Sequence, residues 1–231
     1  MIKIYLSKLN TELSEEITSD LLKLVSEESR EKFYKFHFLE DSLRSLYGEI
    51  IVRNFVSQHF KIKNEEIHIL KNKYGKPYIE NVPVHFNISH SGSWIACGIS
   101  DQNIGIDIEK MKETNLGIAK RFFCDKEYEL LISKKEEDRM ELFYLLWTLK
   151  ESYIKWMGTG LSTGLDTFCF HISDNKITVT DDSFTERPHF KNYGIEEYQL
   201  SVCSDSANLP DEVEIIELEQ LSMNSLGHCY D

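Results

Sequence analysis

The sequence predicts an α+β fold made of two similar halves, which we place at residues 1–103 and 104–231. Stretches with helical spacing of apolar residues are mixed with short segments that have the composition of mainly antiparallel strands. In each half a long helix, which ends near Phe55 or near Trp156, is followed by a glycine turn and then by strands. This correspondence between the halves favours an internal duplication.

The first half is expected to start with a strand and to continue with helices. A glycine and a proline near residue 76 indicate a turn, because glycine frees the backbone and proline restricts it. The expected helices cover residues 14–25, 27–35 and 41–60. The expected strands cover residues 1–5, 84–88 and 94–99, with a turn at residues 89–93.

The second half is expected to start with a strand in which apolar and polar residues alternate strictly, at residues 103–109. Two short helices and one long helix should follow, and strands should close the chain. The expected helices cover residues 116–123, 125–133 and 141–157. The expected strands cover residues 168–171, 176–180, 197–203 and 214–218.

Composition and charge exclude several classes of protein. The chain has 231 residues, 41% of them hydrophobic, which is typical of a globular protein and excludes intrinsic disorder. The longest apolar run has six residues, too few to span a membrane, and the polar start does not resemble an export signal. A net charge of −13 disfavours binding to nucleic-acid backbones. We therefore expect a cytoplasmic protein that binds neither membrane nor nucleic acid.

Charge and cysteines are distributed in ways that bear on partners and on metal binding. Residues 1–103 carry a balance of −1, and residues 104–231 carry −12, which suits either a cationic partner or a solvated acidic surface. The five cysteines form no CxxC pair and no pattern of zinc ligands, so we expect reduced thiols.

Three acids and two lysines are candidates for chemistry on a metal and a phosphate. Asp107 and Glu109 alternate on one strand and share a face, where their oxygens can converge on a hard cation. Glu151 and Lys155 share one face of the long helix, with Lys150 at its edge. The plain alternatives are an acidic outer strand face and a surface ion pair between Glu151 and Lys155.

A polar turn follows the apolar strand near residue 86. The segment Phe86-Asn87-Ile88-Ser89-His90-Ser91-Gly92 offers hydroxyls, an imidazole and backbone N–H groups to an anion. A hairpin loop rich in turn-forming residues is the alternative. The chain contains neither a P-loop nor a GxGxxG motif, so the usual sequence signals for nucleotide phosphates are absent.

Four strings occur in a fixed order and together carry a family resemblance. They are Gly75-Lys76-Pro77, the segment from Phe86 to Ser91, Gly105-Ile106-Asp107-Ile108-Glu109, and Trp147-Thr148-Leu149-Lys150-Glu151-Ser152-Tyr153-Ile154-Lys155. Arg121-Phe122-Phe123 and Glu127-Tyr128 lie between the last two. From about residue 3 to residue 220 the chain resembles the Sfp-type (surfactin-type) 4′-phosphopantetheinyl transferases, which activate carrier proteins of peptide, polyketide and fatty-acid synthases.

The resemblance implies a monomer whose halves are related by a pseudo-twofold axis, with coenzyme A in the cleft between them. It implies that Mg²⁺ is held by Asp107, Glu109 and Glu151. Lysines of the long helix, Lys155 and Lys150, would meet the coenzyme's phosphates. The remaining coenzyme contacts that it implies are Lys32, Arg44 and His90 for the 3′-phosphate, and Gly75, Lys76, Pro77 and Ser89 around the adenine. Ser29 stands where close family members carry a further lysine.

The implied reaction is attack by a carrier serine on the β-phosphate of coenzyme A, with release of 3′,5′-ADP. Glu151, directly or through a metal-bound water, is the candidate base, and Glu109 and Lys155 complete the catalytic set. The apo acyl or peptidyl carrier protein should dock near residues 112–128, on Leu116, Ile118, Phe122 and Phe123. Two alternatives stay open: a hydrolase of the coenzyme A pyrophosphate, and a non-catalytic module that binds coenzyme A or a carrier protein.

Overall fold

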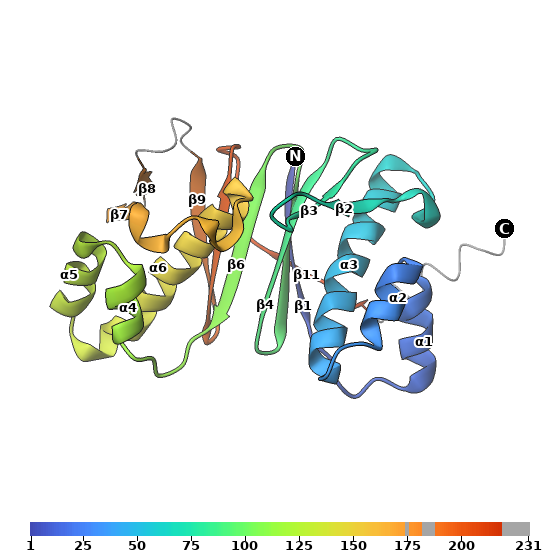
Figure 1. Ribbon diagram of the computed structural model, residues 1–231, viewed down its shortest axis with the longest axis horizontal. Coiled ribbons are helices and arrows are strands. Elements are labelled where there is room, and N and C mark those ends of the chain that lie inside the picture. The colour runs from blue at the N-terminus through green and yellow to red at the C-terminus, as the bar shows by residue number, and fades with distance from the viewer. Residues whose placement is uncertain (174–175, 182–187, 219–231) are drawn as a thin grey trace.

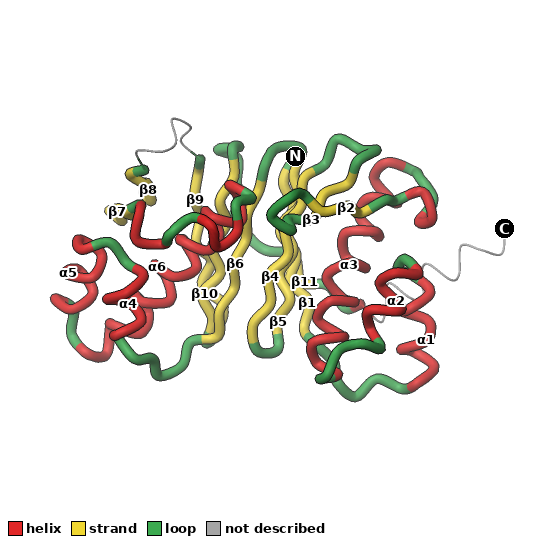
Figure 2. The backbone as a smooth tube through the Cα atoms, in the orientation of Figure 1, coloured by secondary structure: helices red, strands yellow, loops and turns green. Residues whose placement is uncertain are grey.

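Two β-sheets lie beside each other at the centre of the molecule, with helices on the outer side of each (Figures 1 and 2). The computed structural model describes residues 1–173, 176–181 and 188–218. The predicted α+β class is confirmed by this mixture of helices and mainly antiparallel strands.

The first half surrounds a sheet with the strand order β11-β1-β5-β4. The strands β1, β5 and β4 are antiparallel neighbours, whereas β11 lies parallel to β1. The elements of this half are β1 (Ile2–Lys8), α1 (Glu15–Lys23), α2 (Glu27–Phe33), α3 (Leu39–Phe60), β2 (Ile69–Lys71), β3 (Pro77–Ile79), β4 (His85–Ser91) and β5 (Trp94–Ser100), with β11 (Glu214–Ile215) added from the end of the chain. Residues 214–218 thus return to the first half, where Leu218 joins its core.

The second half surrounds a sheet with the strand order β6-β10-β9, in which all pairs are antiparallel. A separate two-stranded ribbon, β7 and β8, lies beside it (Figure 1). The elements of this half are β6 (Ile104–Lys110), α4 (Gly117–Phe122), α5 (Asp125–Ser133), α6 (Glu136–Met157), β7 (Cys169–Ser173), β8 (Lys176–Thr180), β9 (His189–Ile195) and β10 (Tyr198–Ser204).

Three apolar clusters hold these layers together. One packs α1–α3 on the first sheet, and another packs α4–α6 with the ribbon on the second. The third lies between the two sheets and contains the predicted apolar face of β6, Ile104, Ile106 and Ile108, together with Ile4 and Leu6 of β1. Burial of apolar area on both faces of each sheet joins the halves into one body.

Strands β4 and β6 lie side by side although they belong to different sheets. Alternate side chains of β4 accept hydrogen bonds from alternate backbone N–H groups of β6. These bonds run from Ile106 N to Asn87 Oδ1 (2.9 Å), from Ile108 N to Ser89 Oγ (3.4 Å) and from Lys110 N to Ser91 Oγ (3.1 Å). From one bond to the next, the residue number increases by two on β4 and by two on β6. The two strands therefore run in the same direction and are joined through side chains.

Most predicted elements are present, with differences at their ends. Strand β4 continues to Ser91, so the turn expected at residues 89–93 is shorter, since Ser89 and Ser91 take part in the junction with β6. The long helix α6 starts at Glu136 rather than near residue 141, and the last expected strand is reduced to Glu214–Ile215. Strands β2, β3 and β9 were not expected from the sequence.

The expectation of reduced cysteines is wrong for one pair. Cys124, before α5, and Cys169, at the start of β7, form a disulfide, and their Cα atoms are 5.8 Å apart, within the range that a disulfide can bridge. Cys97 and Cys203 are buried free thiols, and Cys229 lies outside the described residues. In the part of the chain that the structure describes, no helix is long and apolar enough to cross a membrane.

Candidate active site

Gly105 allows helix α6 to touch strand β6. A Cβ atom at this position would meet the backbone of Ser152 and Trp156 at distances that real Cβ atoms do not show. Residues on the last two turns of α6 therefore lie directly over the face of β6 that carries Asp107 and Glu109. This close approach brings the acids of the strand and the charged residues of the helix into one group.

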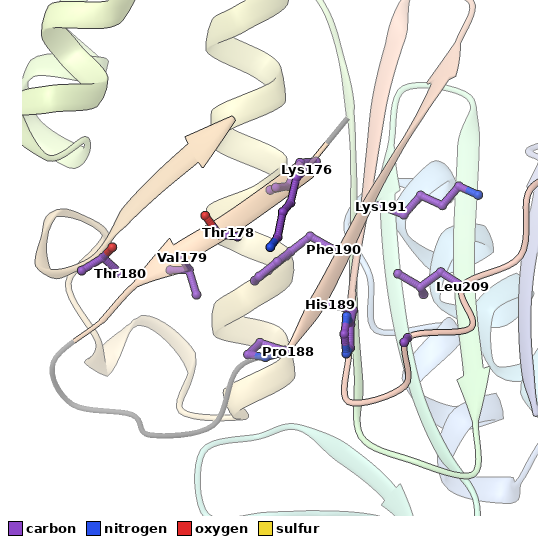
Figure 3. Close-up of a pocket in the computed structure, with 11 residues that line it drawn as sticks. Lys176, Thr178, Val179, Thr180, Pro188, His189, Phe190, Lys191 and Leu209 are labelled. Atoms are coloured by element: carbon purple, nitrogen blue, oxygen red, sulfur yellow. The ribbon is translucent and has the colours of Figure 1, made fainter. Parts of the chain in front are cut away.

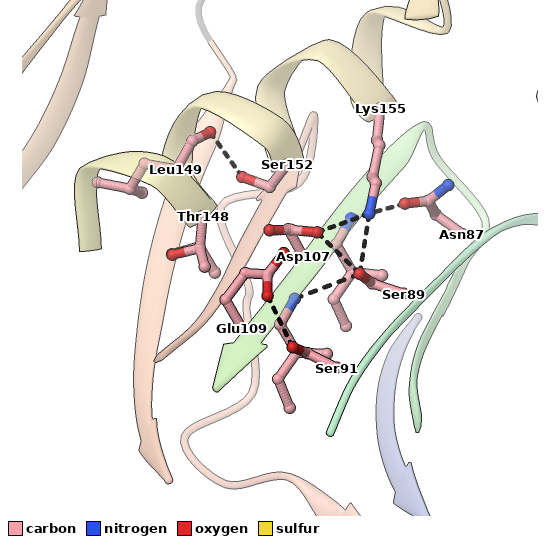
Figure 4. A network of polar contacts seen from close by, with 12 residues as sticks. Asn87, Ser89, Ser91, Asp107, Glu109, Thr148, Leu149, Ser152 and Lys155 are labelled. Atoms are coloured by element: carbon pink, nitrogen blue, oxygen red, sulfur yellow. Dashed lines mark hydrogen bonds and ion pairs between the residues drawn. The ribbon is translucent and has the colours of Figure 1, made fainter. Parts of the chain in front are cut away.

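Asp107 is the centre of that group, at the junction of β4, β6 and α6 (Figure 4). Its Oδ1 atom accepts from Lys155 Nζ at 2.7 Å and from Ser89 Oγ at 2.8 Å. Lys155 also donates to Ser89 Oγ at 2.9 Å, so the three groups form a closed triangle. The other oxygen of Asp107, Oδ2, is buried and has no hydrogen-bond partner among the described residues.

Glu109 and Glu151 complete the acidic group. Burial raises the pKa of Glu151, and the negative charges of Asp107 and Glu109 raise it further. Burial also raises the pKa of Glu109, and Asp107 adds to this shift, whereas a hydrogen bond from Ser91 opposes it. Carboxylates that act on one another in this way are crowded together and have lost part of their solvation.

The donor set of this group suits a magnesium ion. As oriented here, no three acidic, histidine or cysteine side chains of the described residues enclose an ion. Lys155 instead neutralises one oxygen of Asp107. Carboxylates that repel one another, and a buried oxygen that lacks a protein partner, are nevertheless what a hard divalent cation would satisfy.

The residues expected at the coenzyme's 3′-phosphate lie next to this group on the side of α3. Partial burial lowers the pKa of His90, and the positive charges of Arg44 and Lys155 lower it further, so both cations act on the same imidazole. Arg44 forms ion pairs with Glu40 and Asp41, each at 2.8 Å. Its Nη2 also donates to the carbonyl of Gly92 at 3.1 Å.

Ser29 and Lys32 of α2 contact helix α3, which carries Arg44. Lys32 Nζ donates to Ser45 Oγ at 3.2 Å, in the turn of α3 that also carries Arg44. Ser29 donates a hydrogen bond to Glu49, so this hydroxyl faces a carboxylate. The position at which relatives were expected to carry a lysine is therefore adjacent to a negative charge.

The glycine turn lies between the halves, at the other end of β6. Gly75 has a φ of 90°, which a glycine adopts without strain. Lys76 Nζ donates to Asn103 Oδ1, to the carbonyl of Ile104 and to the carbonyl of Trp156, at 2.9, 3.1 and 3.2 Å. Burial lowers the pKa of Lys76 to about 8. Its ammonium thus links the two halves.

A cavity of about 230 Å³ opens beside this turn. Its walls come from both halves and include Lys76, Pro77, Phe86, Trp156 and Met157. Apolar residues share these walls with the polar side chains of Asn72, His85 and Asn103, a mixture that suits a flat ring system with polar edges. Ser89, expected near the adenine as well, uses its hydroxyl within the triangle around Asp107.

Lys150 does not belong to the candidate site. Its ammonium is fully buried between α6 and α5, where it pairs with Glu127 Oε2 at 2.7 Å. It also donates to the carbonyls of Leu165 and Phe168. The expectation that Lys150 binds the coenzyme is corrected accordingly, because all its observed partners are in the core of the second half.

A separate cavity of about 690 Å³ lies elsewhere in the second half (Figure 3). It is lined by β8, by the start of β9 and by Ala207 and Leu209. None of the predicted site residues lines it.

The expected docking segment forms α4 and α5, next to the start of α6 (Figure 1). Phe123 is 3% exposed and packs on Phe143, whereas Phe122 is only half-buried and meets Trp147 edge to face. Ile118 is 40% exposed. The two phenylalanines thus separate into one core residue and one residue that reaches the surface.

Several polar residues of this region were not predicted as functional. Asn87 and Ser91 form the junction with β6, and Glu127 accepts hydrogen bonds from the backbone of Cys124 and Phe170. The alternation of Asn87, Ser89 and Ser91 in the sequence is a signal that all three share one face of a strand. For Glu127 the sequence offers only its place in the pair Glu127-Tyr128, which belongs to the family resemblance but predicts no contact.

Comparisons with known proteins agree with the resemblance seen in the sequence. The family model "4'-phosphopantetheinyl transferase superfamily" matches residues 103–203, and "4'-phosphopantetheinyl transferase, N-terminal" matches residues 13–101. The 4′-phosphopantetheinyl transferase ffp of Bacillus subtilis is 39% identical over 95% of this chain and 100% of its own length. Sfp of Bacillus subtilis strain 168 is 37% identical over the same shares. The enzyme gsp of Aneurinibacillus migulanus is 35% identical over 88% of this chain and 86% of its own.

Proposed function

This chain belongs to the Sfp-type 4′-phosphopantetheinyl transferases, enzymes that transfer phosphopantetheine from coenzyme A to carrier proteins, and we propose that its reaction takes place around Asp107. The observation that carries this proposal is the triangle of Asp107, Ser89 and Lys155 beside two acids whose pKa values are raised. Perturbed acids and a lysine in one partly buried group are typical of active sites.

Asp107, Glu109 and Glu151 would hold Mg²⁺. When bound, the ion offsets the negative charge of the pyrophosphate and orients it for in-line displacement. Support comes from the buried Oδ2 atom of Asp107 and from the mutual repulsion of the three acids, which a divalent cation relieves.

Lys155 is suited to a phosphate oxygen. A lysine ammonium has three N–H donors, and two of them point to Asp107 and Ser89. The third is available for an oxygen of the coenzyme's pyrophosphate, and the side chain is 26% exposed. In this position its charge offsets the charge that develops on the leaving 3′,5′-ADP.

Glu151 is suited to accept the proton of the carrier's serine, with Glu109 as a second acid of the same set. Its pKa is raised by burial, which makes the carboxylate a better base. The serine oxygen would form a bond to the β-phosphorus of coenzyme A, the bond to 3′,5′-ADP would break, and the serine proton would pass to Glu151. The products are the modified carrier and 3′,5′-ADP.

The coenzyme would lie across both halves. His90, with Arg44 and Lys32 behind it, would meet the 3′-phosphate, and the cavity beside Gly75, Lys76 and Pro77 would receive the adenine. Since the ammonium of Lys76 and the hydroxyl of Ser89 have internal partners, their contacts to the coenzyme would come from the lysine stem and from backbone atoms.

The carrier protein would dock on residues 112–128. The half-buried Phe122 and the exposed Ile118 supply an apolar surface next to α6. We further propose that the enzyme acts as a cytoplasmic monomer, in which one chain carries all the residues named above.

A panel of apo-carrier proteins tests the proposal. The enzyme is incubated with coenzyme A, Mg²⁺ and each carrier, and the carriers are weighed by mass spectrometry. We expect at least one carrier to gain one phosphopantetheinyl group, with an equal amount of 3′,5′-ADP released. Release of 3′,5′-ADP without any carrier would instead indicate a hydrolase, and neither product would indicate a binding module.

A further inference from the structure

Two serines of β4 each contact one acid of β6. Ser89 Oγ donates to Asp107 Oδ1 at 2.8 Å, and Ser91 Oγ donates to Glu109 Oε2 at 2.7 Å (Figure 4). Each hydroxyl also accepts a backbone N–H of β6, and for Ser91 this donor is Lys110 N at 3.1 Å. A hydroxyl can donate one hydrogen and accept others. Each serine oxygen accepts the backbone N–H of β6 and donates its own hydrogen to the carboxylate.

The two serines differ in whether they contact Lys155. Ser89 takes part in the triangle with Lys155, whereas the side chain of Ser91 contacts Glu109 and the backbone of β6. Ser91 is half-buried at the end of β4, next to the turn at Gly92. Any influence that it has on the reaction therefore passes through Glu109 or through the junction of β4 with β6.

Glu109 requires such a partner more than Asp107 does. Its side chain has one more rotatable bond, so fixing its orientation costs more conformational entropy. Groups that fix the orientation of a metal-binding carboxylate strengthen metal binding without touching the ion.

We propose that Ser91 is a positioning residue that holds Glu109 in the orientation in which it binds a divalent cation. The inference rests on the proposed magnesium site and adds a residue to which no role in the reaction was assigned above. It also gives the junction between β4 and β6 a second purpose, because the same hydroxyl joins the two halves and orients an acid.

The test measures binding of Mn²⁺ alone, by electron paramagnetic resonance of the free ion, to the full-length protein. Removal of an outer partner of a metal ligand costs about 10- to 100-fold in metal affinity, and we expect Ser91→Ala to weaken Mn²⁺ binding by about tenfold. Ser91→Thr keeps the hydroxyl and should remain close to wild type. Ser93→Ala is the matched control, because Ser93 is an exposed serine two residues further along the same hairpin.

A double variant separates positioning of Glu109 from support of the strand junction. If Ser91 acts through Glu109, Ser91→Ala should weaken binding no further in a Glu109→Ala background. A residual loss in that background, or a loss that Ser91→Thr does not restore, would overturn the inference, as would wild-type affinity in Ser91→Ala. Should Ser91→Ala fail to fold, Ser91→Cys, which is similar in size but a weak donor, takes its place with the same expectation.

The outcome is separable from that of the proposed function. A wild-type enzyme that modifies a carrier but binds no Mn²⁺ would overturn the role of Ser91 and leave phosphopantetheinyl transfer intact. A wild-type protein that binds Mn²⁺ tightly, loses this affinity in Ser91→Ala and modifies no carrier would support the role of Ser91 and count against the proposed reaction.

Discussion

Glu127 and Lys150 form an ion pair of 2.7 Å in which both side chains are almost completely buried. The pair joins α5 to α6, and hydrogen bonds to the backbone of β7 and of the residues before it satisfy the remaining donors and acceptors. The Cys124–Cys169 disulfide also joins the residue before α5 to the start of β7. Helix α5, part of the segment expected to receive the carrier protein, is therefore anchored to the second half by buried polar and covalent contacts.

Lys150→Met should destabilise the protein without changing its affinity for coenzyme A. Removal of one partner leaves Glu127 as an uncompensated buried charge, which costs about 3–5 kcal/mol in the free energy of unfolding. Lys35→Met is the control, because it breaks an exposed pair with Glu31 worth at most about 1 kcal/mol. Urea denaturation measures the free energy of unfolding, and the KM for coenzyme A reports on the affinity for the coenzyme. A stable Lys150→Met enzyme with a raised KM would restore Lys150 to the coenzyme site.

Gly105→Ala should reduce both stability and turnover. The added methyl group would displace α6 from β6, with a cost of about 1–3 kcal/mol or more for overpacking. Because Lys155 and Asp107 would separate, kcat should fall by about 10- to 100-fold. Gly194→Ala, in strand β9, is the control, since a Cβ there meets nothing within 4 Å. Wild-type kcat in Gly105→Ala would show that this close approach does not position the site.

Glu151→Gln should make the metal-free protein more stable at neutral pH. Burial and the neighbouring acids raise the pKa of Glu151 above its usual value of 4.5, so the folded protein holds this proton more tightly than the unfolded chain. The resulting stabilisation is complete below the unfolded pKa and is lost as pH rises through the folded pKa. The gain in Glu151→Gln should thus be present at pH 7 and shrink towards pH 4, in unfolding measured with a chelator present.

The exposed Glu113→Gln is the control for this comparison. If Glu151→Gln is less stable than wild type at pH 7, Glu151 is stabilised by its surroundings and the crowding of the three acids is not the dominant effect.

Phe122→Ala should raise the KM for the carrier and leave the KM for coenzyme A unchanged. A half-buried aromatic at a docking surface contributes about 1–2 kcal/mol, which corresponds to about 5- to 30-fold in KM. Phe123→Ala, a core truncation, should instead cost about 3–5 kcal/mol in stability. Equal changes of both KM values in Phe122→Ala would mean that Phe122 serves packing rather than docking.

Local patterns were sufficient to predict which faces of β6 and α6 carry the acids, and most of the secondary structure. Strict alternation in β6 separated its apolar residues, which are buried between the sheets, from Asp107 and Glu109 on the other face. Helical spacing placed Glu151 and Lys155 together, and the structure directs Lys155 to Asp107.

Contacts between distant segments could not be predicted from such patterns. Lys150 adjoins Glu151 in sequence but points towards Glu127 of α5, and α6 contacts α5 as well as β6. The pairing of Cys124 with Cys169 joins positions 45 residues apart, and it depends on β7 lying beside α5. The junction of β4 with β6 depends in the same way on two strands of different sheets meeting edge to edge.

Turnover of single-site variants tests the central claim most directly. Wild type, Asp107→Ala, Glu109→Ala and Glu151→Ala are each incubated with coenzyme A, saturating Mg²⁺ and an apo-carrier that wild type modifies, and the modified carrier is quantified by mass. We predict that each variant folds, as judged by circular dichroism, and loses most of the activity, because each lacks one of the three carboxylates beside Lys155. Near wild-type turnover in any of the three would contradict the placement of the reaction around Asp107.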